Sequence, residues 1–160
     1  MRRFRPTMIV TLLLALSATP AWADATLFLG ATTTPTNRTA RGAALGTGLL
    51  LVGFEFEYSS TTEDVKSGAP SLKMGSANGL LQTPVPILGL QPYVTAGAGI
   101  FRERVGTSTD TSIAPNVGGG VKVNLAGPLR LRVDYRAFRL GGGARYSPSH
   151  RVYVGLNLKF

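Results

Sequence analysis

Few residues of this chain have the type and spacing to carry out chemistry. His150 is the only histidine, and Ser147 and Ser149 lie beside it in the sequence. Activating a serine requires a base within hydrogen-bond reach and a third group to orient that base. A single histidine excludes a three-histidine zinc site. The absence of cysteine excludes cysteine-ligated metals, cysteine nucleophiles, disulfides and lipid attachment through cysteine. The sequence therefore predicts no catalytic residue and no metal ligand.

Charged residues instead occupy alternate positions in two segments. One segment carries Glu55 and Glu57, and the other, residues 129–140, carries charges at every second position from Arg130 to Arg136. Two neighbouring carboxylates could indicate a glycoside hydrolase. The arginines elsewhere in the chain make ion pairing the stronger interpretation. Residues two apart lie on one face of a β-strand. The arrangement of the strands therefore determines which of these charges lie close to one another.

Period-two alternation of apolar and polar residues runs through the chain after Asp24 and predicts strands rather than helices. Glycine and proline mark the turns between them. Eight strands are predicted, at residues 25–33, 43–50, 53–62, 71–83, 91–103, 113–125, 129–140 and 149–160.

The connections between these strands alternate in length, which is typical of a membrane barrel with long outer loops and short periplasmic turns. Several strands are long enough to cross a bilayer at a tilt, which takes about 9–11 residues. An even number of strands places both termini on the periplasmic side. The predicted fold is all-β: a closed antiparallel eight-stranded transmembrane up-and-down barrel.

The N-terminal segment has the pattern of an export signal. Three arginines precede an apolar run over residues 8–18, and Ala21-Trp22-Ala23 has the small-x-small form of a cleavage site. We predict a signal peptide over 1–23, cut after Ala23, and a barrel domain over 24–160. The cut removes three arginines and no acid, so the formal charge falls from +9 to +6. Export argues against a nucleic-acid partner in spite of this basic charge.

The two faces of the strands predict an internal ion-pair network. In an eight-stranded barrel the third and seventh strands stand opposite each other, and the interior is just wide enough for side chains to fill. Buried charges need partners, and Asn116, Asn124 and Asn157 are expected to help satisfy the surplus of positive charge. The alternative is an ordinary solvated face. The network is predicted to comprise Glu55, Glu57, Lys122, Arg130, Arg132, Asp134 and Arg136.

The last strand carries a resemblance to a known family. Its apolar residues alternate and end in a terminal aromatic: Val152, Val154, Leu156, Leu158 and Phe160. This pattern resembles the signature that the barrel-assembly machinery recognises in bacterial outer-membrane barrels. Residues 24–160 as a whole resemble the small OmpA/OmpX-type barrels, which implies a Gram-negative-type outer membrane and no cofactor. Some small barrels are lipid A deacylases with a serine two places after a histidine, but Val152 occupies that position here.

Four arginines fall in the predicted outer loops: Arg38, Arg41, Arg104 and Arg145. Arginine suits phosphate groups, so we hypothesise that they contact lipopolysaccharide; general solvated charge is the alternative. The leading functional hypothesis is a structural, envelope-integrity or surface-interaction barrel without catalysis. Three alternatives remain open: a narrow channel, a secreted soluble barrel of lipocalin type, and a lipid-modifying enzyme.

Overall fold

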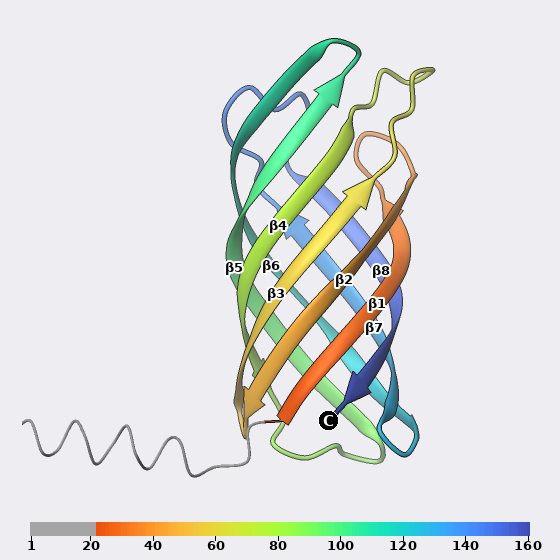
Figure 1. Cartoon of the computed structure of the whole chain (residues 1–160), viewed down its shortest axis with the longest axis vertical. Helices are drawn as coiled ribbons and strands as arrows, with labels where there is room; N and C mark the ends of the chain where they lie inside the picture. Colours follow the sequence, from red (N-terminus) through yellow and green to blue (C-terminus); the bar gives the residue numbers. More distant parts are fainter. Residues whose placement is uncertain (1–21) are drawn as a thin grey trace, which may run out of the picture.

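The computed structural model describes residues 22–160, which form one closed antiparallel barrel with its strands in chain order (Figure 1). Each strand pairs with its sequence neighbours, and β1 closes the barrel against β8. The eight strands are β1 (Trp22–Thr32), β2 (Arg38–Leu49), β3 (Val52–Thr61), β4 (Ser71–Gln82), β5 (Leu90–Val105), β6 (Ser108–Ala126), β7 (Leu129–Phe138) and β8 (Ser149–Lys159).

The barrel has two rims. We call the lower rim the end that holds the connections 50–51, 83–89 and 127–128, and the upper rim the end that holds 33–37, 62–70, 106–107 and 139–148. The first strand starts and the chain ends at the lower rim, where the Ala23 and Phe160 backbones exchange hydrogen bonds of 3.0 and 2.9 Å. Both ends of the described chain are therefore tied into the sheet.

The predicted fold class and the eight strands are confirmed, but two boundaries near the upper rim were wrong. β2 begins at Arg38 rather than residue 43, and β6 begins at Ser108 rather than residue 113. The β5–β6 connection is only 106–107, because Ser108 to Ser112 continue the backbone ladder with β5. These outer strand ends are polar on both faces, so hydropathy alternation does not mark them. Arg41 and Arg104 consequently lie in strands and not in loops.

The signal-peptide prediction falls almost entirely on residues 1–21, outside the described residues. The predicted cut after Ala23 lies within β1, which begins at Trp22 and pairs there with Gly48 of β2. That cut remains a prediction.

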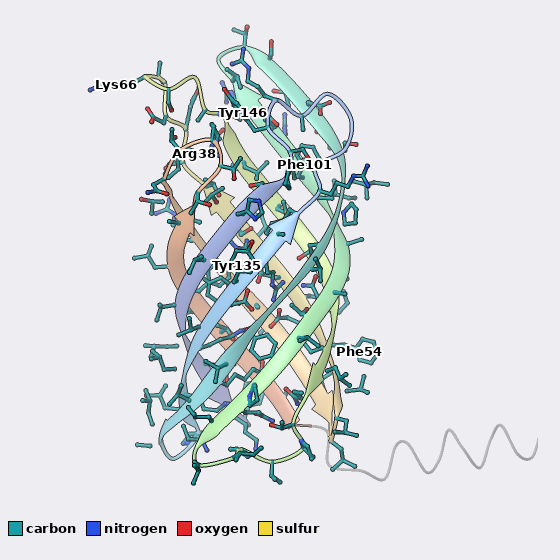
Figure 2. The ribbon with its side chains drawn as sticks, turned by 180° about the vertical axis from the view of Figure 1, so that it is seen from behind. Arg38, Phe54, Lys66, Phe101, Tyr135 and Tyr146 are labelled. Atoms are coloured by element: carbon teal, nitrogen blue, oxygen red, sulfur yellow. The ribbon has the colours of Figure 1, made fainter. Side chains whose placement is uncertain are left out.

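The wall of the barrel carries apolar side chains outside and polar ones inside. Leu27 and Phe56 are 70% and 69% exposed, whereas Arg132 is completely buried. Phe54 projects outward from the wall in Figure 2. A soluble barrel would point its apolar side chains inward, so this arrangement is that of a membrane barrel. Among residues 22–160 there is no helix with the length and apolar character to cross a membrane.

The interior towards the upper rim is filled by an apolar cluster, which we call the plug. It consists of Leu72, Met74, Phe101, Ala114, Phe138 and Leu140, with Ala144 packed against it from the 139–148 connection. Two buried charged residues, Arg38 and Glu103, also lie at this end, whereas the charged side chains that form ion pairs with one another lie beneath the plug. The interior therefore has two layers, one near the upper rim that contains the plug and a charged layer of ion pairs towards the lower rim.

Candidate functional site

The charged layer is positioned by strands on opposite walls of the barrel. β3 and β7 are separated by three strands in either direction around the closed sheet, so their inward side chains face each other. β2 contributes almost no bulk, because its inward positions between Arg38 and Leu49 are Ala40, Gly42, Ala44, Gly46 and Gly48. This small-residue wall leaves room for the long arginine side chains of β7.

Four residues form a closed ring of alternating charge at the centre, which we call the charge ring. Glu55 of β3 pairs with Arg132 and, at 2.6 Å, with Arg136. Asp134 pairs with the same two arginines at 3.0 and 3.1 Å. All four side chains are at most 1% exposed. Each buried charge thus has at least two partners of opposite sign, the condition under which burying a charge is tolerated.

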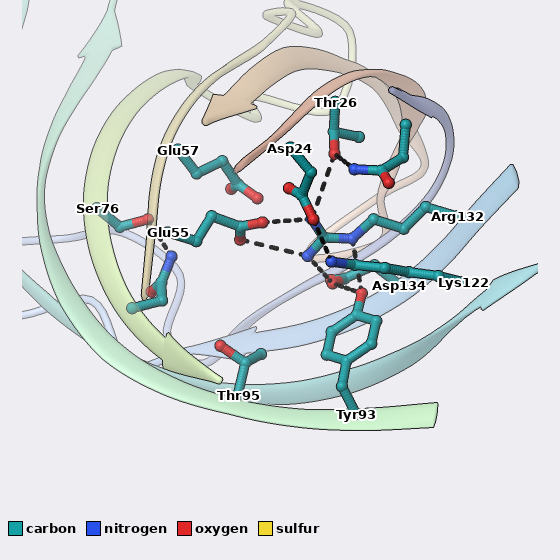
Figure 3. Close-up of polar contacts among 12 residues, drawn as sticks. Asp24, Thr26, Glu55, Glu57, Ser76, Tyr93, Thr95, Lys122, Arg132 and Asp134 are labelled. Atoms are coloured by element: carbon teal, nitrogen blue, oxygen red, sulfur yellow. Dashed lines mark hydrogen bonds and ion pairs between the residues drawn. The ribbon is translucent and has the colours of Figure 1, made fainter. Parts of the chain in front are cut away.

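Tyr93 of β5 braces the charge ring from a third strand. Its hydroxyl donates to Asp134 and accepts a 2.7 Å hydrogen bond from Arg132 Nε. In Figure 3, Tyr93, Arg132 and Asp134 converge on one point in the interior. Gly120 permits this approach, because a Cβ there would lie 2.6 Å from the Tyr93 hydroxyl oxygen.

The network extends from the ring towards the plug through Glu57 and Arg151. Glu57 lies 3.3 Å from Arg136 Nη1 and also pairs with Arg151 of β8. The Arg151 guanidinium also lies 4.9 Å from the centre of the Phe138 ring. A cation over an aromatic face is attracted by the ring quadrupole, so Arg151 joins the charged layer to the plug.

Towards the lower rim, Asp24 holds two cations with one oxygen. Lys122 Nζ lies 2.5 Å and Arg130 Nη2 lies 3.1 Å from Asp24 Oδ2. The remaining nitrogens of Arg130 donate to Asn157 at 2.8 Å and to Gln91 at 3.0 Å. Across the whole network, five basic side chains thus face four acidic ones.

The structure places all seven residues of the predicted network inside the barrel, in ion pairs with one another or with Asp24 and Arg151. Asn116 and Asn157 also lie inside, whereas Asn124 is exposed near the lower end of β6, next to a shift in the β6–β7 register. Sequence reasoning missed Asp24, Tyr93 and Arg151. Arg151 lies on the same polar face of the last strand as Asn157, so the alternation pattern could have identified it as an inward residue.

The four arginines assigned to outer loops lie in different environments. Arg38 is only 6% exposed, so its assignment to a lipopolysaccharide-contacting surface was wrong. Its guanidinium turns inward to the Pro70 carbonyl, and donates to the Thr34 carbonyl at 2.7 Å, which ties together two upper connections. Arg145 is exposed in the 139–148 connection. Arg41 and Arg104 are exposed on strands.

Arg41 belongs to a row of basic residues that sequence reasoning did not detect. The register links Arg41 to Ser60, Ser60 to Lys73, and Lys73 to Arg102 across β2, β3, β4 and β5. Arg104 lies two residues further along β5 on the same face. Lys73, Arg102 and Arg104 are all exposed. Every ion pair recorded in the described chain lies inside the barrel, so none neutralises this basic row.

The predicted assembly signal lies on the outside of β8 and at the end of the chain. Its five residues are between 42% and 69% exposed, with Phe160 at the upper figure. They form one apolar stripe along the strand that closes the barrel against β1.

His150 is held by Tyr135 rather than by a serine. The Tyr135 hydroxyl lies 2.8 Å from His150 Nδ1, and the two rings stack. The Ser147 hydroxyl accepts a 3.0 Å hydrogen bond from the Leu140 amide. Within residues 22–160, no group of three or more His, Asp or Glu side chains is placed to hold a metal ion.

Comparison with known proteins identifies the fold. Neither a family model nor a curated protein matches the chain. Among solved structures, it is similar to the N-terminal β-barrel domain of Pseudomonas aeruginosa OprF, with a TM-score of 0.68 and 16% identity over 87% of this chain and 97% of that one. The fold is that of the small eight-stranded outer-membrane barrels.

Two further outer-membrane structures have this fold. Neisserial surface protein A matches with a TM-score of 0.66 and 19% identity, over 88% of this chain and 96% of that one. The outer-membrane enzyme PagL matches with a TM-score of 0.53 and 14% identity, over 86% and 98%. One of these neighbours is an enzyme, so the shared barrel fold alone does not assign the function.

We predict that Glu55→Gln lowers the free energy of unfolding by roughly 3–5 kcal/mol, because it leaves two buried arginines with too little negative charge. Urea unfolding of the barrel in detergent, followed by the mobility difference between folded and unfolded bands on a gel, measures this. The matched control is Glu63→Gln, which removes the same charge from an exposed position in the 62–70 connection. Equal stability of the two variants would contradict the charge ring as a stabilising element.

Proposed function

We propose that this chain is an integral outer-membrane protein with a structural, envelope-integrity or surface-interaction role, and that it neither catalyses a reaction nor conducts solutes. The observation that carries the proposal is the filled interior. Charged side chains from opposite walls meet at the charge ring, and the plug lies between this ring and the upper rim. The same proposal assigns the β8 stripe ending at Phe160 to recognition by the barrel-assembly machinery during insertion.

The plug argues against the alternative of a narrow channel. Met74, Phe101 and Phe138 are each at most 3% exposed and come from three different strands. A water-filled path would have to displace these side chains and break ion pairs of the charge ring. The lipocalin-type alternative is disfavoured by the buried charge ring and by the exposed apolar side chains of the outer wall, because a soluble barrel would hold its apolar side chains inside and its charges outside.

A lipid-modifying activity is the second candidate, because PagL is an outer-membrane enzyme of similar fold. The contacts of His150 argue against it here. A nucleophile needs its base within about 2.6–3.2 Å, and His150 Nδ1 is engaged by the Tyr135 hydroxyl. Ser149, its neighbour in sequence, is buried at 3% exposure on the opposite parity of β8.

The basic row, which includes Arg41 and Arg104 from the predicted set of four arginines, is proposed to contact phosphate groups of lipopolysaccharide. Lys73 and Arg102 face each other across β4 and β5, and like charges in this position repel unless an anion lies between them. Beyond Lys73 on the outward face of β4, the next side chains are small: Gly75, Ala77 and Gly79. This shallow apolar strip would accommodate acyl chains below a phosphate bound to the row.

We expect no reproducible open-pore conductance from the folded protein in planar bilayers, because the plug and the charge ring fill the interior. The preparation is first checked for a band shift between unheated and boiled samples. The matched comparison is a triple substitution of Met74, Phe101 and Phe138 to Ala, which empties the plug while leaving the ring charges. Steady single-channel steps from the unmodified protein would defeat the filled-interior proposal.

Overexpression in an outer-membrane bacterium is expected to leave lipid A unchanged, because the described contacts of His150 supply no activated serine. Mass spectrometry of lipid A from expressing and non-expressing cells measures this. If a new lipid A species appears and His150→Ala abolishes it, the second candidate function replaces the first.

Replacing Lys73, Arg102 and Arg104 together with Gln is expected to weaken lipopolysaccharide binding roughly tenfold, because charge-assisted contacts to phosphate are lost. Binding is measured at two salt concentrations, since contacts between exposed charges weaken with ionic strength. The control triple replaces Lys66, Arg139 and Arg145 with Gln, three exposed cations of the upper connections. A larger loss in this control would place the lipid contact on the connections instead of the row.

A further inference from the structure

The lower part of the barrel contains a cavity of about 420 Å³. Its inner lining includes Asp24, Gln91, Lys122 and Arg130, and Leu50 of the 50–51 connection and Val85 of the 83–89 connection lie at its lower-rim edge. The volume falls in the range of small-molecule sites, roughly 300–1,000 Å³. We call this cavity the vestibule.

The vestibule carries an excess of positive charge. Lys122, Arg130 and Lys159 all line it. One oxygen of Asp24, Oδ2, pairs with both Lys122 and Arg130. Glu55 also lines it, but its two oxygens are engaged by Arg132 and Arg136. Two buried cations therefore share one oxygen of a single carboxylate.

Two of these cations are held away from water. Lys122 is 3% exposed and Arg130 is 6% exposed. In Figure 3, Lys122 and Asp24 both point into the interior. A buried cation without a full counter-charge is costly, and an entering anion would relieve that cost. The excess of positive charge therefore favours a negatively charged ligand.

The remaining wall of the vestibule is apolar and shaped by glycine. Leu80, Pro84 and Val85 line one side, and the nearby inward positions of β2 carry no side chain at Gly46 and Gly48. A Cβ at Gly48 would lie 3.0 Å from the Gln82 amide nitrogen, so a larger side chain there would enter the cavity. A ligand would thus meet cations at one end and hydrocarbon at the other.

We propose that the vestibule binds a small amphipathic carboxylate, with its anionic group at Lys122, Arg130 and Lys159 and a short apolar group against Leu80 and Val85. It opens at the lower rim, which faces the periplasm in the orientation that the sequence predicts, with both termini on the periplasmic side. The site does not depend on the absence of a pore or of catalysis, and it is separate from the basic row on the outer wall.

The test titrates the folded barrel in lipid nanodiscs with butyrate and follows backbone amide shifts by NMR. Saturable shifts are expected at residues 46–48, 85 and 122, and n-butanol, which has the same chain without the charge, is expected to give none. Lys159→Gln should weaken butyrate binding about tenfold through loss of one charge-assisted contact. Gly48→Val should abolish it by filling the cavity while keeping every charge.

The matched control is Lys66→Gln, which removes one lysine charge at the upper rim and should leave butyrate binding unchanged. Each variant is checked for a heat-dependent band shift, and if Gly48→Val does not fold, Lys159→Gln decides. Shifts that do not saturate, equal effects of butyrate and butanol, or unchanged binding in Lys159→Gln would each overturn the proposal.

Discussion

The structure depends on one constraint, which is that charge inside a narrow barrel must be neutralised by charge from the opposite wall. The charge ring meets this constraint with two carboxylates and two guanidinium groups in alternation, so that no member has a like-charged nearest partner. The planar guanidinium presents several donors in fixed directions and can bridge two carboxylates at once. Tyr93 then fixes the ring to a third strand through one hydroxyl that both donates and accepts.

The ring also determines what the neighbouring strands must be. Arginine side chains that reach across the interior require space, and the inward positions of β2 are alanine and glycine. Gly120 has a similar role where Tyr93 approaches β6. The lower part of the interior is less completely balanced, because Asp24 alone serves Lys122 and Arg130. The same network thus stabilises the barrel where its charges are balanced, at the charge ring, and provides the proposed binding site where they are not, beside Asp24.

Much of the fold followed from alternation. Strands with one apolar and one polar face were predicted near their observed positions, and the outward side chains of β3, β7 and β8 are those of the apolar parity. Prediction was weakest near the upper rim. There β2 and β6 begin with residues that are polar on both faces, so only the backbone ladder reveals that Arg41 lies in a strand and that Arg38 turns inward.

The sequence by itself determined the number of strands, the order of polar and apolar faces, and the presence of both charges on one parity, because these properties depend on residues one and two places apart. Only the tertiary structure decided which charges meet. Glu55 and Arg132 are 77 residues apart, and their contact depends on barrel closure and strand tilt, which bring opposite walls to the same depth. The basic row has the same origin, since its members lie on different strands and become neighbours only through the register.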